Sequence, residues 1–209
     1  MKYETAIFDM DGTVIDSGEA IYKTVNEVRD ELNLPPLERE FIIKAINEPG
    51  RNLALEFYGI DTPSRSLKEG FEEKFKKFYD ECATTYEGVK ELLQKCKDAH
   101  YKVVLASNAP HDTLEKILKK NEIYELFDEV IGASKEIPQK PDPAMLHLAV
   151  SKTGADKAIF IGDSLKDELA AKNANMPYVQ VCWGFGEESK TATYNAKNVS
   201  EAWEIILNF

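Results

Sequence analysis

The stretch FDMDGT, residues 8–13, follows directly on the apolar run TAIF of residues 5–8. It places two carboxylates, Asp9 and Asp11, at the end of a short strand of the buried type and just before a glycine turn. Open α/β sheets bind their ligands at the carboxyl ends of their strands. Two acids without basic neighbours repel each other there unless a cation or a proton transfer uses them. The stretch therefore indicates a functional site at a strand end.

Strand-like apolar runs alternate with amphipathic helical patterns along most of the chain, which is typical of a parallel sheet built from βαβ units. We therefore predict an α/β fold with a doubly wound, Rossmann-like parallel sheet. The predicted strands are residues 5–10, 102–106, 129–132, 158–161 and 178–182. Helical patterns lie between them and again at residues 200–207.

Residues 17–85 interrupt the alternation, because they show helical periodicity and no strand signal. This interval is too long for one crossover helix, so we predict an inserted all-α cap subdomain over the site end of the sheet. The predicted division is a catalytic core of residues 1–15 and 88–209 and a helical cap of residues 16–87. A stripe of phenylalanines at positions 71, 75 and 78 favours core packing over an aromatic ligand site.

The composition narrows the class of protein. The 209 residues carry a formal charge of −11, which argues against nucleic acid or an anionic membrane as a partner. Three widely spaced cysteines fit thiols in a reducing compartment better than a disulfide framework. Since no apolar run approaches membrane-spanning length, we expect a cytoplasmic protein.

The two acids of the opening stretch suit phosphoryl transfer. A carboxylate placed like Asp9 can attack phosphorus and hold the phosphoryl group as an acyl phosphate. Strand alternation puts Asp11 on the same face, where it can protonate the leaving oxygen and later activate water. The alternative is structural, because Asp11-Gly12 is also a common turn dipeptide.

Polar groups follow two later strand-like segments. Ser107 ends the run of residues 103–106, and its hydroxyl, with Asn108 as a further donor, can bind phosphate oxygens. A local turn hydrogen bond is the common alternative. Lys140 precedes the helix start Pro-Asp-Pro at residues 141–143 and can balance carboxylates and phosphate at the sheet edge. A solvated surface lysine is the alternative for this position.

The last polar pair follows the run of residues 158–161. Asp163 falls near Asp9 if the two strands are neighbours, and Mg²⁺ typically takes one or two carboxylates together with waters and phosphate oxygens. Ser164 and Asp167 have the spacing of a helix capping box. Asp167 can fill that role and also tether Lys140 or a metal-bound water.

Taken together, the four motifs D-x-D-G-T, S-N, K-P-D-P and G-D-S-x-x-D occur in this order, each at an expected strand end. In this the chain resembles the haloacid dehalogenase-like hydrolase superfamily. It is most similar to the group of phosphoglycolate phosphatases and β-phosphoglucomutases that have a helical cap. The resemblance covers essentially the whole chain, from Ala6 to Ile206.

The resemblance implies a role for each motif. Asp9 would be the nucleophile and a Mg²⁺ ligand, and Asp11 the general acid and base that gives the metal its backbone carbonyl. Asp163 would be the metal-binding acid. Ser107 matches the phosphate-binding motif and Lys140 the charge-balancing one. An acid at position 11 also argues against the dehalogenase branch, where that position is not acidic.

The chain departs from the family pattern at residues 46–51, where the specificity loop of the cap is expected, because the usual glycine pattern is missing. The substrate is therefore left open. Arg51 can meet a substrate carboxylate or phosphate with two hydrogen bonds, and a surface arginine is the alternative. His111 lies beyond Asn108 and is either pocket-lining or an exposed loop residue.

We accordingly predict a Mg²⁺-dependent phosphatase, monomeric or homodimeric. It would hydrolyse a small-molecule phosphomonoester, phosphoglycolate-like or a sugar phosphate, through an aspartyl-phosphate intermediate. Two alternatives remain. One is a sugar-phosphate mutase of the β-phosphoglucomutase type, and the other is a non-catalytic protein that binds a phosphate ligand.

Overall fold

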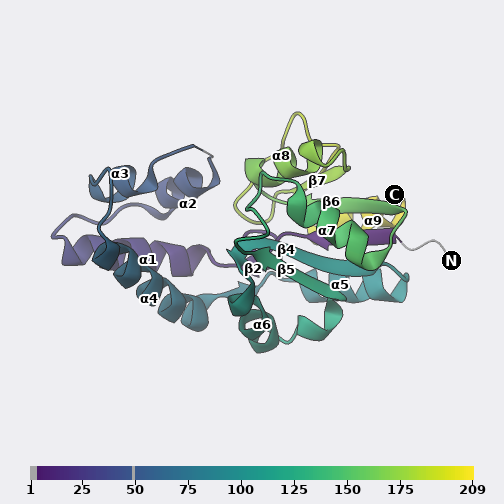
Figure 1. Cartoon of the computed structure of the whole chain (residues 1–209), viewed down its shortest axis with the longest axis horizontal. Coiled ribbons are helices and arrows are strands. Elements are labelled where there is room, and N and C mark those ends of the chain that lie inside the picture. Colours follow the sequence, from purple (N-terminus) through teal and green to yellow (C-terminus); the bar gives the residue numbers. More distant parts are fainter. Residues whose placement is uncertain (1–3, 49) are drawn as a thin grey trace. The chain divides into compact units, whose positions relative to one another are not determined.

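A computed structural model describes residues 4–48 and 50–209. The chain divides into two compact units (Figure 1). The first contains the residues up to Ile15 together with Thr85–Phe209, and the second is Asp16–Thr84. The chain passes between them through two short strands that pair with each other, β2 (Ile15–Asp16) and β3 (Thr84–Thr85).

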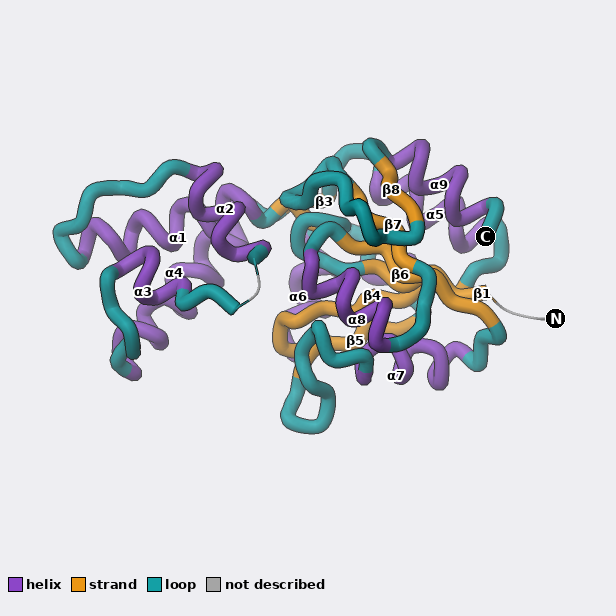
Figure 2. Tube along the Cα trace, turned by 90° about the horizontal axis from the view of Figure 1, so that it is seen from above, coloured by secondary structure: helices purple, strands orange, loops and turns teal. Residues whose placement is uncertain are grey.

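The first unit is built on a six-stranded sheet in which every neighbouring pair is parallel (Figure 2). In spatial order its strands are β5 (Glu129–Ala133), β4 (Lys102–Pro110), β1 (Glu4–Phe8), β6 (Lys157–Gly162), β7 (Tyr178–Val181) and β8 (Tyr194–Ala196). The order reverses at β1, so β4 and β6 flank it. Ligand sites in open α/β sheets lie at this reversal.

Helices cover both faces of the sheet. They are α5 (Val89–Asp98), α6 (His111–Lys120), α7 (Ala144–Thr153), α8 (Leu165–Asn173) and α9 (Val199–Leu207), with a 3₁₀ turn at Tyr124–Leu126. Apolar side chains of α7 and α8 share one core cluster with Ile7, Val104 and Phe160 of the three central strands. Figure 2 shows α5 and α9 across the sheet from α7. Burial on both faces explains why these strands are continuous apolar runs.

The predicted α/β fold with a parallel, Rossmann-like sheet is confirmed, and five of its strands lie where the sequence predicts them. The sixth, β8, was missed because it is three residues long and half exposed, with the sequence Tyr-Asn-Ala. The apolar pattern that identifies a buried strand is absent there.

The second unit is helical, with α1 (Gly18–Glu31), α2 (Arg39–Asn47), α3 (Leu53–Tyr58) and α4 (Arg65–Cys82). A small core of Val25, Ile42, Ala45 and Phe57 holds it together. The phenylalanine stripe of α4 is half-buried: Phe71 packs at the edge of that core and stacks on Phe75 with ring centroids 6.2 Å apart.

The second boundary of the helical unit differs from the predicted one. The structure groups residues 85–87 with the sheet, because Thr85 N–H donates to Asn121 Oδ1 at 3.0 Å and Tyr86 N–H donates to Val14 O at 3.1 Å. The sequence placed the boundary after residue 87, at the turn before α5. Hydrogen bonds between distant segments leave no local signal that would have moved it.

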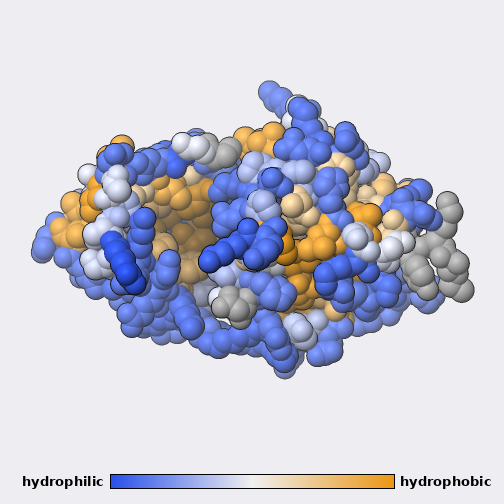
Figure 3. Space-filling model, in the orientation of Figure 1, coloured by the Kyte–Doolittle hydropathy of each residue, from blue (hydrophilic) through white to orange (hydrophobic). Residues whose placement is uncertain are grey.

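Polar and charged side chains cover most of the face drawn in Figure 3, and apolar patches remain on both units. Leu32, Phe41 and Leu55 are exposed large apolar side chains of the helical unit. Within the described ranges, no helix is both long and apolar enough to cross a membrane. Cys82, Cys96 and Cys182 are free thiols.

Candidate active site

The site lies at the carboxyl edge of the central strands. Asp9 comes directly after β1, and Asp163 directly after β6. Ser107 lies in the carboxyl-terminal half of β4, in register with Gly132 of β5. Asp9 N–H donates to Ile161 O at 2.8 Å, which extends the pairing of β1 with β6 by one residue. Because the strands are parallel and adjacent, these side chains meet at the same edge.

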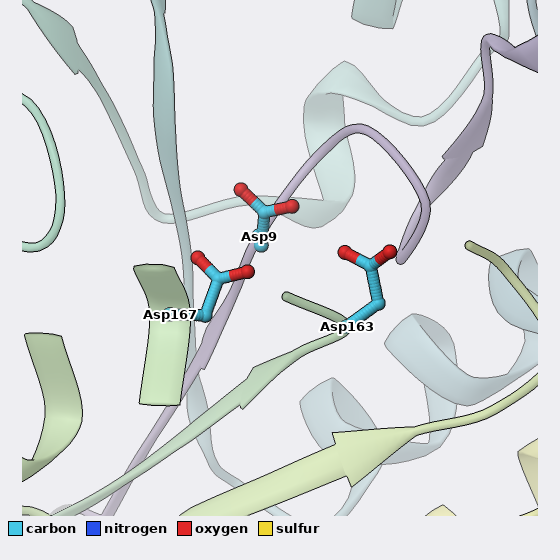
Figure 4. A group of neighbouring side chains, drawn as sticks. All are labelled: Asp9, Asp163 and Asp167. Atoms are coloured by element: carbon cyan, nitrogen blue, oxygen red, sulfur yellow. The ribbon is translucent and has the colours of Figure 1, made fainter. Parts of the chain in front are cut away.

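Three carboxylates converge there (Figure 4): Asp9 and Asp163 from strand ends, and Asp167 from the first turn of α8. One oxygen of each lies within 4.8 Å of the others, and each residue is at most 7% exposed. Burial, assisted by the charge of Asp167, raises the pKa of Asp9 to about 7. Burial and then the charge of Asp9 raise the pKa of Asp163 well above its usual value. So much buried negative charge requires cations.

Lys140 supplies one of those cations. It is buried, and its Nζ contacts Oδ1 of Asp9, lies 2.6 Å from Oδ1 of Asp167 and donates to Ala106 O at 2.9 Å. Burial alone would lower the pKa of Lys140, but the charges of Asp167 and Asp9 outweigh it and raise this pKa. The ammonium therefore stays charged, and the alternative of a solvated surface lysine does not hold.

The side chain of Asn108 holds the backbone of Lys140. Lys140 N–H donates to Asn108 Oδ1 at 2.7 Å, and Asn108 Nδ2 donates to Lys140 O at 3.1 Å. Gln139 Nε2 in turn donates to Asn108 O at 3.1 Å. This clamp was not predicted, because it joins two loops that are far apart in the sequence. A direct contact of Asn108 with phosphate stays a prediction.

Asp167 combines the two roles considered for it. Oδ2 accepts the backbone N–H of Ser164 at 3.1 Å, while Asp167 N–H donates to Ser164 Oγ at 3.3 Å, which closes the capping box of α8. Oδ1 is left for Lys140. Gly162 permits this approach, since an added Cβ there would lie 2.7 Å from the Cβ of Asp167.

One carboxylate oxygen of Asp163 accepts no hydrogen bond from the described residues. Its Oδ1 is 3.5 Å from the hydroxyl of Thr13, but its buried Oδ2 has no hydrogen-bond partner among the described residues. Gly12, at φ +85°, passes so close that an added Cβ would lie 2.3 Å from this Oδ2. A buried carboxylate oxygen without a donor is costly, which points to a bound cation.

The donor set fits a hard divalent cation. Asp9 and Asp163 offer carboxylate oxygens, the ligands that Mg²⁺ prefers, and Asp163 Oδ2 is unused. Asp11 is half-buried in the turn that follows, where it forms a bridge with Ile15, and its side chain is not part of the three-acid cluster. Asp11 is expected to bind the metal through its backbone carbonyl, and this role stays a prediction.

Three further predicted residues lie as follows. Ser107 is buried, and its Oγ accepts the Ala109 N–H at 3.1 Å, so the local turn bond is present. His111 is exposed and begins α6. Arg51 belongs to the helical unit, where Glu48 at 2.8 Å and both oxygens of Glu56 hold its guanidinium. Contact of Arg51 with substrate stays a prediction, and it requires the guanidinium to exchange these bonds for bonds to the substrate.

Residues of β7 and of the loop that follows it also support the site, and sequence reasoning missed them. Gln180 Nε2 donates to Asp163 O at 2.7 Å, and Trp183 Nε1 donates to Thr13 O at 3.0 Å. One signal was available, the run Trp-Gly-Phe-Gly at residues 183–186 just beyond a predicted strand. Glycines at such a strand end favour close backbone approach.

Comparisons with known proteins give a consistent result. The family model of haloacid dehalogenase-like hydrolases matches residues 6–181. The pyrophosphatase PpaX of Bacillus velezensis is 31% identical over 211 residues, which cover 99% of this chain and 96% of that protein. A phosphoglycolate phosphatase of Xanthomonas campestris pv. campestris is 28% identical over 190 residues, 88% of this chain and 86% of that protein.

A solved structure agrees in fold. A haloacid dehalogenase-like family protein of Streptococcus pneumoniae superposes with a TM-score of 0.80 at 22% identity, covering 98% of each chain. The resemblance read from the four motifs is confirmed, and so is the expected class of enzyme, a phosphatase of this kind. The chain therefore belongs to the haloacid dehalogenase-like hydrolase family.

Proposed function

We propose that this enzyme hydrolyses a small-molecule phosphomonoester with the help of Mg²⁺ and through a phosphoryl group carried by Asp9. The observation that carries the proposal is the pairing of Asp9 with Lys140 beside the unused Oδ2 of Asp163. That arrangement leaves a buried carboxylate oriented by a cation, with a second oxygen ligand ready for a metal.

In the first step, an oxygen of Asp9 attacks phosphorus, and the bond from phosphorus to the ester oxygen breaks. Asp11 gives its proton to the leaving oxygen. Lys140 fixes one carboxylate oxygen of Asp9 and so restricts the direction of attack. Bound Mg²⁺, held by Asp9 and Asp163, would neutralise charge on the phosphoryl oxygens.

In the second step, water attacks the phosphorus of the aspartyl phosphate, and Asp11 takes up a proton from that water. The bond from phosphorus to Asp9 breaks, which restores the carboxylate. We propose that the hydroxyl of Ser107 donates to a phosphoryl oxygen throughout, since its Oγ already accepts from Ala109 and keeps its own proton to give. Lys140 offsets negative charge in both steps.

For the substrate we propose a phosphoglycolate-like ester or a sugar phosphate. The names of the two relatives, a pyrophosphatase and a phosphoglycolate phosphatase, support a small phosphorylated compound. The helical unit, inserted directly after the D-x-D-G-T motif, stays our proposal for the part that selects it. Action in the cytoplasm is a proposal too, supported by the free thiols, and a monomer or homodimer stays a prediction.

The test is phosphate release from a panel of phosphomonoesters, with and without Mg²⁺. The panel holds phosphoglycolate, sugar phosphates, nucleoside monophosphates, pyrophosphate and an aryl phosphate. We expect Mg²⁺-dependent turnover that Asp9→Asn abolishes. The matched control is Asp98→Asn, an exposed acid of α5 that bonds only Gln94 among the contacts described.

Turnover that survives Asp9→Asn would remove Asp9 as the nucleophile. Turnover that is unaffected by a chelator would exclude the proposed role of Mg²⁺ in the reaction. Isomerisation of a hexose phosphate without release of phosphate would replace the phosphatase by the mutase.

A further inference from the structure

The segment Trp183–Gly186 after β7 lies directly against the turn that carries the D-x-D-G-T motif. Trp183 Nε1 donates to Thr13 O at 3.0 Å. The main chains touch at the next residue, because an added Cβ at Gly184 would lie 1.7 Å from Gly12 O. Any side chain at position 184 would therefore push the motif turn away.

The same segment also contacts the backbone of Asp163. An added Cβ at Gly186 would lie 2.0 Å from Asp163 O, and Gln180 Nε2 of the neighbouring strand β7 donates to the same oxygen at 2.7 Å. Gly12 in turn packs against the Asp163 carboxylate. Gly12 is thus packed between Gly184 on one side and the carboxylate of Asp163 on the other.

The remainder of this loop is fixed at its far end. Ser189 Oγ donates to Glu168 Oε2 at 2.8 Å, and Thr191 donates to the other oxygen of the same carboxylate. Ser189 N–H also donates to Asn195 Oδ1 at 2.8 Å. Since Glu168 lies on α8 and Asn195 on β8, the loop is held on both sides and can act as a rigid support.

We propose that Trp183–Gly186 is a positioning element, which holds the motif turn and Asp163 at the separation that the reaction needs, with Trp183 as its principal residue. The inference rests on the proposed function, because it concerns the spacing of Asp9 and Asp163 as oxygen ligands. Its structural part, the restraint of residues 10–15, holds with or without a metal.

The main test is amide hydrogen exchange in the metal-free protein. Val14 and Ile15 N–H both donate to Met10 O at 2.8 Å, so their exchange reports opening of the motif turn. Trp183→Phe keeps a large ring but removes the indole N–H. We expect these amides to exchange about threefold to tenfold faster, the range that one net hydrogen bond supports.

Trp203→Phe is the matched control, because the chain has two tryptophans and Trp203 lies on α9 with its ring 5.8 Å from Lys95 Nζ. We expect no change at residues 14 and 15 in this variant. Gly184→Ala is a second probe of the same contact and should act in the same direction as Trp183→Phe. Equal exchange at these amides in wild type, Trp183→Phe and Gly184→Ala overturns the proposal.

A second readout is Mg²⁺ binding measured by calorimetry without substrate. We expect Trp183→Phe to weaken it about threefold to tenfold, and Trp203→Phe to leave it unchanged. Wild-type affinity in Trp183→Phe contradicts a role in setting the ligand spacing. If the wild type itself turns over substrate without metal, the proposed function fails, while the exchange contrast between the two tryptophan variants still decides this inference.

Discussion

Lys140 Nζ lies 2.6 Å from Oδ1 of Asp167, while the other oxygen of Asp167 accepts the first backbone N–H of the capping box of α8. The carboxylate thus ties the position of the lysine to the start of a helix. Lys140 in turn contacts Asp9. The proposed nucleophile Asp9 is therefore oriented by α8 indirectly, because Lys140 pairs with both Asp9 and Asp167.

Removal of Lys140 should lower both activity and stability. In Lys140→Met, three buried acids lose their cation, and we expect kcat to fall by about a hundredfold or more. At pH 8 the metal-free variant should lose about 3 kcal/mol of unfolding free energy, the size seen when one partner of a buried pair is removed. Urea unfolding with and without Mg²⁺ measures this.

The stability loss should shrink toward pH 5, because acids whose folded-state pKa is raised are less penalised when they are protonated. Lys152→Met is the control, since Lys152 pairs with Glu129 at 2.7 Å with its side chain 45% exposed, and such pairs contribute little. Equal urea midpoints for wild type and Lys140→Met would refute the structural role of this lysine.

The two roles of Asp167 can be separated by substitution. Ser164→Ala removes the cap but leaves the pair with Lys140, so we expect about 1 kcal/mol of lost stability and little change in kcat. Asp167→Asn weakens the ion pair while an amide oxygen can still cap, so kcat should fall about tenfold or more with a smaller loss of stability. Steady-state kinetics and thermal unfolding of both variants decide this. The reverse ranking of the two variants in kcat would contradict it.

Asn108 should affect catalysis through Lys140. Asn108→Ala removes both hydrogen bonds to the Lys140 peptide, so we expect kcat to fall about tenfold while KM changes little. Gln139→Ala is the milder control, since Gln139 meets only the backbone oxygen of Asn108 in this clamp. A rise in KM with unchanged kcat would instead support the predicted direct contact of Asn108 with substrate.

Mg²⁺ affinity should depend on pH through Asp9. Its pKa of about 7 in the metal-free protein, raised by burial and by Asp167, means that the carboxylate is mostly protonated at pH 6 and mostly charged at pH 8. A metal binds the charged form and releases the proton, so we expect affinity to rise about tenfold over this range. Calorimetry in two buffers of different ionisation enthalpy measures the released proton. The same affinity at both pH values would contradict the assignment of Asp9 as a ligand.

The sequence predicted the parts of the site that local pattern determines. Asp9 and Asp163 could be placed because an apolar run followed by an acid, at once or after one glycine, marks a strand end, and parallel strands share an edge. The contacts of Asn108 could not be predicted, because they depend on how loops meet after the sheet has formed. The glycines beside Trp183 indicate close backbone approach, but they do not identify Thr13 as its partner. The carboxylates of Glu48 and Glu56 around Arg51 were missed for a related reason, since their rotamers are set by folding of the helical unit.

In the proposed mechanism Asp9 carries the phosphoryl group, and this is tested by trapping the phosphorylated enzyme. In Asp11→Asn the water cannot be activated, whereas an aryl leaving group needs no proton, so the phosphorylated enzyme should accumulate. We predict a burst of one aryl alcohol per enzyme and, by mass spectrometry of the acid-quenched protein, a phosphoryl group on Asp9. A full burst with no phosphoryl group on Asp9 would contradict the account.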